Sequence, residues 1–90
     1  MTSHTTREFR DLLTAMPAQV QKQARDAYAI FQQNPSHPGL RFKQVNAGPP
    51  AVYSARVSIG YRALATVDGD EVVWFWIGSH ADYDRLLRQL

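Results

Sequence analysis

Residues 52–77, with the sequence VYSARVSIGYRALATVDGDEVVWFWI, decide the fold of this chain. β-Branched and aromatic residues dominate the segment, and short breaks divide it into strands. The first two strands, at 52–57 and 61–67, are joined by Ser58-Ile59-Gly60, in which the glycine is expected to supply the left-handed conformation of a tight connection. These residues therefore predict an antiparallel hairpin.

A third strand follows the hairpin and is expected at the centre of the core. Asp68-Gly69-Asp70 has the composition of a second hairpin turn. The strand after this turn, residues 72–77, is apolar on both faces. Such a pattern is typical of a strand that is covered on both sides or paired deep in a sheet.

A further strand is predicted before the hairpin. Residues 40–45 alternate apolar and polar side chains, and loops rich in proline and glycine flank them. The alternation places one set of side chains on each face: Leu40, Phe42 and Gln44 on the first, and Arg41, Lys43 and Val45 on the second.

Three helices complete the pattern. Apolar residues at helical spacing predict helices at 6–15 and from Pro17 to Asn34, and the second ends there because a residue before proline avoids the helical region. Ser79 is a suitable N-cap for a last helix. The apolar stripe of that helix consists of Tyr83, Leu86, Leu87 and Leu90.

The sequence thus predicts a single α+β domain over residues 1–90. An N-terminal two-helix hairpin packs on a mainly antiparallel four-stranded sheet, and a C-terminal helix follows the sheet. Residues 1–5 are expected to add a short edge strand.

The composition excludes several classes of protein. The 90 residues are 44% hydrophobic and 20% charged, which is ordinary for a folded globular domain. Without cysteine a disulfide framework and a thiolate metal site are excluded, and the reducing cytoplasm is the expected compartment. No apolar run reaches the length of a membrane span, so no membrane association is expected. The net charge of +2 permits nucleic-acid binding without requiring it.

Two arginines are candidates for an anion site. If the connection between the first two strands is a symmetric three-residue loop, Val57 pairs with Tyr61, and Arg56 then lies directly opposite Arg62. Like charges that face each other across two strands destabilise a sheet, so something must compensate them.

Two interpretations of this arginine pair remain open. The guanidinium groups converge on a phosphate, or each of them pairs with a nearby carboxylate such as Asp68 or Asp82 or points into solvent. Arg41 and Lys43 share one face of the neighbouring strand, where they either extend the anion site or are simply solvated.

The start of the last helix offers groups for proton transfer. His80 and Tyr83 are neighbours on its first turn. An imidazole moves protons near neutral pH, and a tyrosine hydroxyl can donate to a phosphate oxygen. The alternative is an exposed or structural histidine beside a tyrosine that belongs to the apolar stripe.

Other constellations carry less weight. His4, His37 and His80 are scattered rather than at metal-binding spacing, so no metal is expected. Trp74 and Trp76 are candidates for base stacking, but aromatic residues on a central strand belong more often to the core.

Three runs of the sequence resemble the RelE/ParE superfamily of type II toxins, in particular its RelE-like branch. They are NPSHPGLRFK at 34–43, VYSARVSIGYRAL at 52–64 and VWFWIGSHADYD at 73–84. The middle run has the form Tyr-Ser-x-Arg, four residues, Tyr-Arg, and is fairly specific. The resemblance extends over nearly the whole chain, and the predicted order of two helices followed by a sheet agrees with it.

The resemblance implies a small toxin that a co-expressed antitoxin neutralises. Ribosome-dependent members of the superfamily cleave mRNA in the ribosomal A site without metal or cofactor, through attack of the 2′-hydroxyl on the adjacent phosphate. By motif position, Arg56 and Arg62 would bind and stabilise the phosphate. His80 would serve as general acid or base, and Tyr83 would position or assist.

The resemblance also leaves alternatives open. Arg41 and Lys43 would support the same RNA-binding anion site, but the best-known RelE-type nucleases carry several lysines around the phosphate where this chain offers only Lys43. The ParE branch inhibits DNA gyrase and generally lacks a histidine–tyrosine pair, so His80 and Tyr83 favour the nuclease branch. A gyrase inhibitor and a non-catalytic member that only binds its antitoxin remain alternatives.

Overall fold

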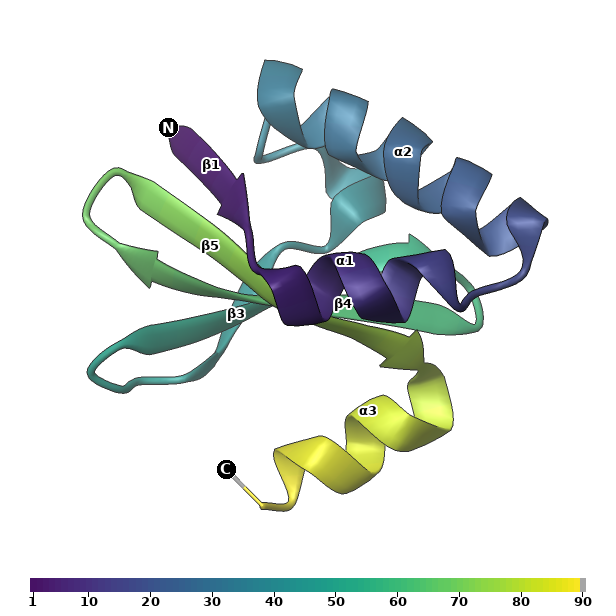
Figure 1. Cartoon of the computed structure of the whole chain (residues 1–90). Helices are drawn as coiled ribbons and strands as arrows, with labels where there is room; N and C mark the ends of the chain where they lie inside the picture. Colours follow the sequence, from purple (N-terminus) through teal and green to yellow (C-terminus); the bar gives the residue numbers. More distant parts are fainter. Residues whose placement is uncertain (90) are drawn as a thin grey trace.

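The computed structural model describes residues 1–89 and confirms the predicted α+β class. Helices α1 and α2 lie over one face of a sheet, and α3 lies against the other face (Figure 1). Within the described residues, no helix is long and apolar enough to cross a membrane. In chain order the elements are β1 (Thr2–Thr5), α1 (Arg7–Thr14), α2 (Ala18–Gln33), a 3₁₀ turn (Pro38–Leu40), β2 (Lys43–Asn46), β3 (Ala51–Ser58), β4 (Tyr61–Asp68), β5 (Glu71–Ser79) and α3 (His80–Leu87).

The strands form one mixed sheet in the order β1-β5-β4-β3-β2. The four strands from β2 to β5 pair antiparallel with their neighbours, as predicted. The expected edge strand exists, and β1 pairs parallel with β5, from Thr2 opposite Glu71 to Thr5 opposite Trp74. Because β5 side chains pack in core clusters on both faces of the sheet, its continuous apolar sequence is explained.

Side-chain caps fix where the helices begin. The Thr6 hydroxyl accepts a hydrogen bond from the Phe9 amide at the start of α1. Ser79 does the same for the Asp82 amide at the start of α3, as the sequence predicts. Helix α2 ends before Asn34, in agreement with the proline that follows.

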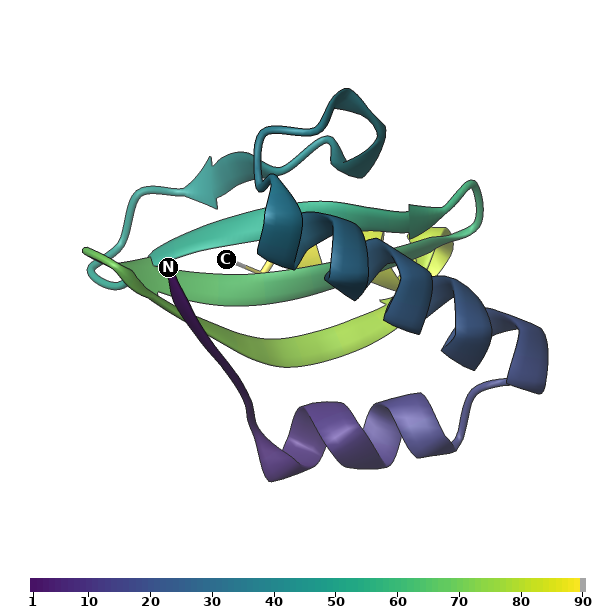
Figure 2. The ribbon, with the colours of Figure 1, turned by 90° about the horizontal axis from the view of Figure 1, so that it is seen from above.

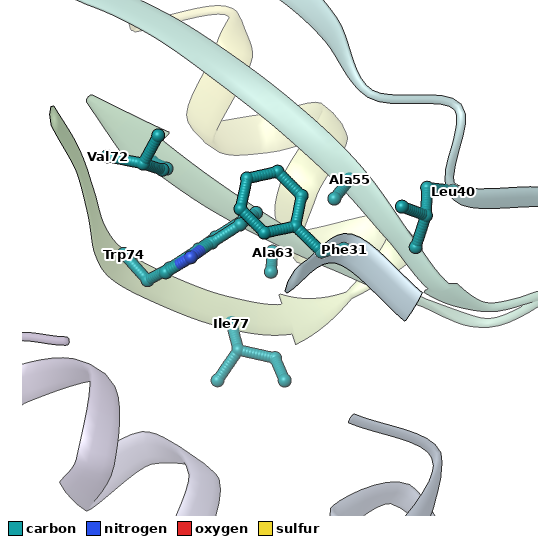
Figure 3. Close-up of a cluster of buried hydrophobic side chains, with 8 residues drawn as sticks. Phe31, Leu40, Ala55, Ala63, Val72, Trp74 and Ile77 are labelled. Carbon is teal, nitrogen blue, oxygen red and sulfur yellow. The ribbon is translucent and has the colours of Figure 1, made fainter. Parts of the chain in front are cut away.

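The larger core cluster lies between the sheet and the first two helices. Figure 3 shows Phe31 of α2 above the side chains of the sheet, among them Trp74 and Ile77 of β5. The rings of Phe31 and Trp74 meet edge to face with centroids 5.2 Å apart. The indole N–H of Trp74 donates to Ser3 Oγ at 3.1 Å, which ties β1 to the core. Trp74 is therefore a core residue and not a base-stacking platform.

A second, smaller cluster lies between the sheet and α3. Val52, Leu64 and Tyr83 are its buried members, and Trp76 and the predicted helix stripe pack against them. Of that stripe, Leu86 and Leu87 are partly buried, whereas Leu90 lies outside the described residues.

A bulge in β5 sends its two tryptophans to opposite faces. Simple alternation would place Trp74 and Trp76 on the same face of the sheet. The register shifts between Leu64 and Ala65, so that Leu64 pairs with Trp76 and Ala65 with Trp74, and Phe75 is the extra residue. Trp74 packs in the cluster under α1 and α2, and Trp76 packs against the cluster under α3.

The strand predicted at 40–45 begins later than expected. Pro38–Leu40 form a 3₁₀ turn, Arg41 is left-handed with φ of 47°, and β2 starts only at Lys43. The predicted faces nevertheless hold, because Phe42 packs in the larger cluster and Val45 in the smaller one.

The predicted geometry of the β3–β4 connection is wrong in detail. Ser58 pairs with Tyr61, so the connection has two residues rather than three, and Val57 does not pair with Tyr61. Gly60 is not left-handed; the positive φ of 57° occurs at Gly69, in the second turn.

Truncation of Phe31 tests whether the larger cluster holds the helices to the sheet. Phe31 is 2% exposed, whereas its neighbour Ile30 is 38% exposed. Phe31→Ala is expected to lower the free energy of unfolding by about 3–5 kcal/mol, through lost transfer energy and the cavity left behind. Urea unfolding measures the loss. The matched control Ile30→Ala should cost less than about 1 kcal/mol, and equal losses would contradict this packing.

Candidate functional site

A cationic cleft of about 230 Å³ opens on the face of the sheet against which α3 packs. The structure brings together there all six residues that the sequence singles out, from β2, β3, β4, α3 and the residue that follows the 3₁₀ turn. A seventh residue, a buried serine, joins them. The lining residues are Arg41, Lys43, Ser54, Arg56, Arg62, His80 and Tyr83.

The two central arginines face each other across β3 and β4. Arg56 is the direct register partner of Arg62. A bulge at Val57 absorbs one residue between this pair and the pair Ser58–Tyr61. The predicted juxtaposition is therefore confirmed, although the bulge and not a symmetric loop produces it.

Backbone oxygens hold the side chain of Arg62. Its Nη1 donates to the carbonyl of Ser58 at 2.7 Å and to that of Tyr61 at 3.0 Å. Within residues 1–89, neither Arg56 nor Arg62 forms an ion pair with a carboxylate, and Asp82 instead pairs with Arg85 of its own helix.

The electrostatic environment of Arg62 is unfavourable for its charge. Burial and then the facing guanidinium of Arg56 lower the pKa of Arg62 from its ordinary value, and Arg41 acts in the same direction. Tyr83 and Asp84 oppose the shift. Because an arginine keeps its proton in proteins, the cleft holds positive charge that an anion would stabilise.

The β3–β4 turn also positions the start of α3. The backbone amide of His80 donates to the carbonyl of Gly60 at 2.8 Å. The Nε2 atom of His80 lies 3.5 Å from Asp84 Oδ2, and its ring centroid lies 5.8 Å from that of Tyr83. Among the described residues, Nδ1 of His80 has no hydrogen-bond partner, which leaves this nitrogen for a ligand.

A left-handed backbone directs Arg41 into the cleft. Its neighbours Leu40 and Phe42 both pack in the core under α2, whereas the side chain of Arg41 lines the cleft. A non-glycine residue rarely adopts φ of 47° and ψ of 42°, and the cost is on the order of 1 kcal/mol. Such strain is found where function requires a particular side-chain direction.

Ser54 is the cleft residue that the sequence interpretation misses. It is 2% exposed and lies between its register partners, Lys43 on β2 and Leu64 on β4. The alternation of side chains along a strand could have identified Ser54, because it places Ser54 and Arg56 on the same face.

A larger groove of about 610 Å³ lies on the opposite face, between the sheet and the first two helices. Figure 2 shows α1 and α2 diverging over the sheet. Apolar side chains such as Phe9, Leu13 and Ile77 line the groove, and Arg10 and Arg25 are among its polar residues. Within residues 1–89, no aspartate or glutamate lines it, and no three histidine, aspartate or glutamate side chains gather as metal ligands.

Comparison with known proteins identifies a family whose sequence profile matches most of this chain. The sequence profile of the ParE-like toxin domain family matches residues 18–85. A search of curated proteins found no significant match.

Similar solved structures cover most of the chain. The archaeal RelE–RelB complex from Pyrococcus horikoshii OT3 matches with a TM-score of 0.70 and 12% identity, over 87% of this chain and 92% of that one. The RelB–RelE complex from Methanococcus jannaschii matches with 0.70 and 19%, over 90% and 95%. YafQ from E. coli matches with 0.68 and 10%, over 90% and 94%. At these identities the likeness concerns the fold.

Replacement of Arg56 by glutamine tests the balance between stability and anion binding. Arg56→Gln removes the repulsion of Arg62, so the free energy of unfolding should rise by about 0.2–1 kcal/mol in chloride buffer. At equal ionic strength, inorganic phosphate should raise the melting temperature of the unaltered protein more than that of the variant, since a bound ligand stabilises the folded state.

Arg25→Gln is the matched control, because Arg25 is exposed on α2 and lies outside the cleft. It should leave both the stability in chloride and the response to phosphate unchanged. A destabilised Arg56→Gln variant would contradict the repulsion between the two arginines.

Proposed function

Since this chain belongs to the ParE-like toxin domain family, we propose that it is the toxin of a type II toxin–antitoxin system and inhibits translation by cleaving mRNA on the ribosome. The observation that carries the proposal is the cleft, which combines four cationic side chains with an imidazole and a phenol in about 230 Å³. The chemistry is attack of an RNA 2′-hydroxyl on the adjacent phosphorus. The P–O2′ bond forms, the P–O5′ bond breaks, and the products are a 2′,3′-cyclic phosphate and a 5′-hydroxyl.

The facing arginines suit the transition state of this reaction. Negative charge accumulates on the non-bridging oxygens as the fifth P–O bond forms, and donors aimed at that charge lower the barrier. In the free protein Arg56 and Arg62 lack carboxylate partners among the described residues and repel each other. An oxyanion between them removes the repulsion, and the gain is largest when the oxyanion carries the most charge. Arg41 and Lys43 extend the positive field to the neighbouring phosphate.

His80 is suited to the proton transfer that the reaction requires. One proton must leave the 2′-hydroxyl and one must reach the 5′-oxygen. Nδ1 of His80 is unpaired within residues 1–89, and Asp84 Oδ2 lies 3.5 Å from Nε2 on the other side of the ring, so Nδ1 is the nitrogen placed to exchange a proton with the RNA. Tyr83, buried beside the imidazole, presents a hydroxyl that can orient the phosphate.

The small size of the cleft supports a reaction that depends on the ribosome. Sites that recognise whole small molecules have volumes of about 300–1,000 Å³. A cleft of about 230 Å³ accommodates a phosphate and the adjoining sugar atoms, but not a base with its recognition contacts. We therefore propose that the ribosome holds the mRNA strand and presents the reacting phosphate, so that the toxin supplies only the catalytic groups.

Variants that remove the imidazole of His80 or the guanidinium of Arg62 test the proposed reaction. His80→Ala and Arg62→Ala should each slow ribosome-dependent cleavage by about 10²-fold or more, because each removes proton transfer or charge stabilisation from the transition state. Purified ribosomes programmed with a defined mRNA, followed by mapping of the new RNA ends, give the rate. His4→Ala is the matched histidine control, since His4 is an exposed residue of β1 and does not line the cleft.

The same assay separates the alternative functions. Intact mRNA together with inhibition of DNA supercoiling by gyrase would replace the nuclease proposal with the ParE-type activity. Intact mRNA, unaffected gyrase and unimpaired growth on overexpression would identify a non-catalytic member that only binds its antitoxin.

We propose a cognate antitoxin as the protein partner, because RelE–RelB complexes are among the similar structures. The groove between the sheet, α1 and α2 is the surface suited to it. Its apolar wall, with Arg10 and Arg25 and no lining carboxylate within residues 1–89, fits an amphipathic segment that carries acidic residues.

Charge reversal at the groove tests this partner surface. Arg25→Glu should weaken binding of the co-expressed antitoxin by about tenfold, because it places like charge against the acidic segment. Cleavage of mRNA should be unchanged, since Arg25 lies outside the cleft. Isothermal titration calorimetry measures the affinity. Arg7→Glu on α1, an equal charge change outside the groove lining, is the control, and equal effects of the two variants would contradict the surface.

A further inference from the structure

Ser54 occupies the floor of the cationic cleft. It lies on the middle of β3, with Lys43 directly opposite on β2 and Arg56 two residues further along the same face. Only 2% of the residue is exposed, yet it lines the cleft, so the little surface that it retains belongs to the cleft floor. Tyr83 forms another part of the same lining.

The hydroxyl of Ser54 has no evident role in the fold. Among the described residues, no hydrogen bond joins this side chain to another group. Within residues 1–89 no fully enclosed side-chain nitrogen or oxygen lacks a hydrogen-bond partner, so the unpaired Ser54 oxygen must open to the cleft. A methyl group at this position would fill the same space without an unpaired polar atom. Leu64, its partner on β4, is fully buried and apolar, so packing alone would accept alanine at position 54.

We propose that the Ser54 hydroxyl donates a hydrogen bond to a non-bridging oxygen of the phosphate bound in the cleft. The inference rests on the proposed function for the identity of that phosphate. Side chains at directly paired strand positions have Cβ atoms about 4.5–5.5 Å apart. An oxygen held between Lys43 and Arg56 therefore lies above Ser54, which contacts it from the floor while the cations contact it from the sides.

A hydroxyl at the floor of the cleft restricts the position of the phosphate more closely than the cations do. Lysine and arginine side chains are long and adjust to many anion positions, whereas serine has a single short side-chain torsion. The hydroxyl of Ser54 consequently fixes the depth and orientation of the phosphate relative to Nδ1 of His80. Ser54 thus becomes a phosphate-contacting residue of the proposed reaction.

The Ser54→Ala variant separates this contact from a structural role. Inorganic phosphate is titrated into ¹⁵N-labelled protein at constant ionic strength, and melting temperature and ribosome-dependent cleavage are measured on the same samples. We expect a dissociation constant for phosphate about tenfold higher, because the lost hydrogen bond is to a charged group. Cleavage should slow by at least as much, and the melting temperature should stay equal or rise. Ser36→Ala, at an exposed serine outside the cleft lining, should behave as the unaltered protein.

Each contrary result identifies what has failed. Unchanged phosphate affinity in Ser54→Ala would overturn the contact while leaving the proposed function intact. A melting temperature that falls together with the affinity would assign Ser54 a structural role and also overturn the contact. An unaltered protein that cleaves no mRNA on ribosomes would overturn the proposed function itself. If that protein still bound phosphate in a Ser54-dependent manner, the contact would stand for anion binding alone.

Discussion

The pairing of β3 with β4 is the constraint on which the site depends. It places two guanidinium groups opposite each other, an arrangement that costs about 0.2–1 kcal/mol in a sheet. The same two strands supply Ala55, Ala63 and Leu64 to cores on both faces, and each of these residues is at most 6% exposed. Burial of one leucine contributes about 1.5–3 kcal/mol, so packing further along the hairpin exceeds the repulsion at its end.

The helices and strands of this fold can be predicted from the sequence because the features that specify them involve residues close together in the chain. Spacing of apolar residues, the capping side chains and the turn at Gly69 each involve neighbours within a few positions. The bulges at Val57 and Phe75 were not predictable, since an extra residue in a strand leaves no mark on composition and shows itself only through the partner strand. The left-handed Arg41 was missed for a related reason, because this conformation usually belongs to glycine or asparagine.

The charged residues of the candidate site were predictable from the sequence. Strand alternation and an approximate register suffice to bring Arg56 to Arg62, and the error over the partner of Tyr61 was harmless because the bulge at Val57 restores the pairing. A basic residue can be recognised from the sequence alone as a candidate ligand for an anion. A small neutral residue such as Ser54 cannot, because its role becomes visible only when the structure shows that α3 and β2 enclose it with charged neighbours.

The placement of the charges explains how a net charge of only +2 is compatible with a concentrated anion site. Carboxylates on the helices pair with cations of the same helix, as Asp11 does with Arg7 and Asp26 with Lys22. These exposed pairs contribute little to stability, but they neutralise the helix surfaces. Within residues 1–89 the central arginines of the sheet have no carboxylate partner, so the positive charge of the cleft is not neutralised in the same way. Under the proposed function, this charge would attract an RNA backbone toward the cleft, where the imidazole, the phenol and the serine hydroxyl are also placed.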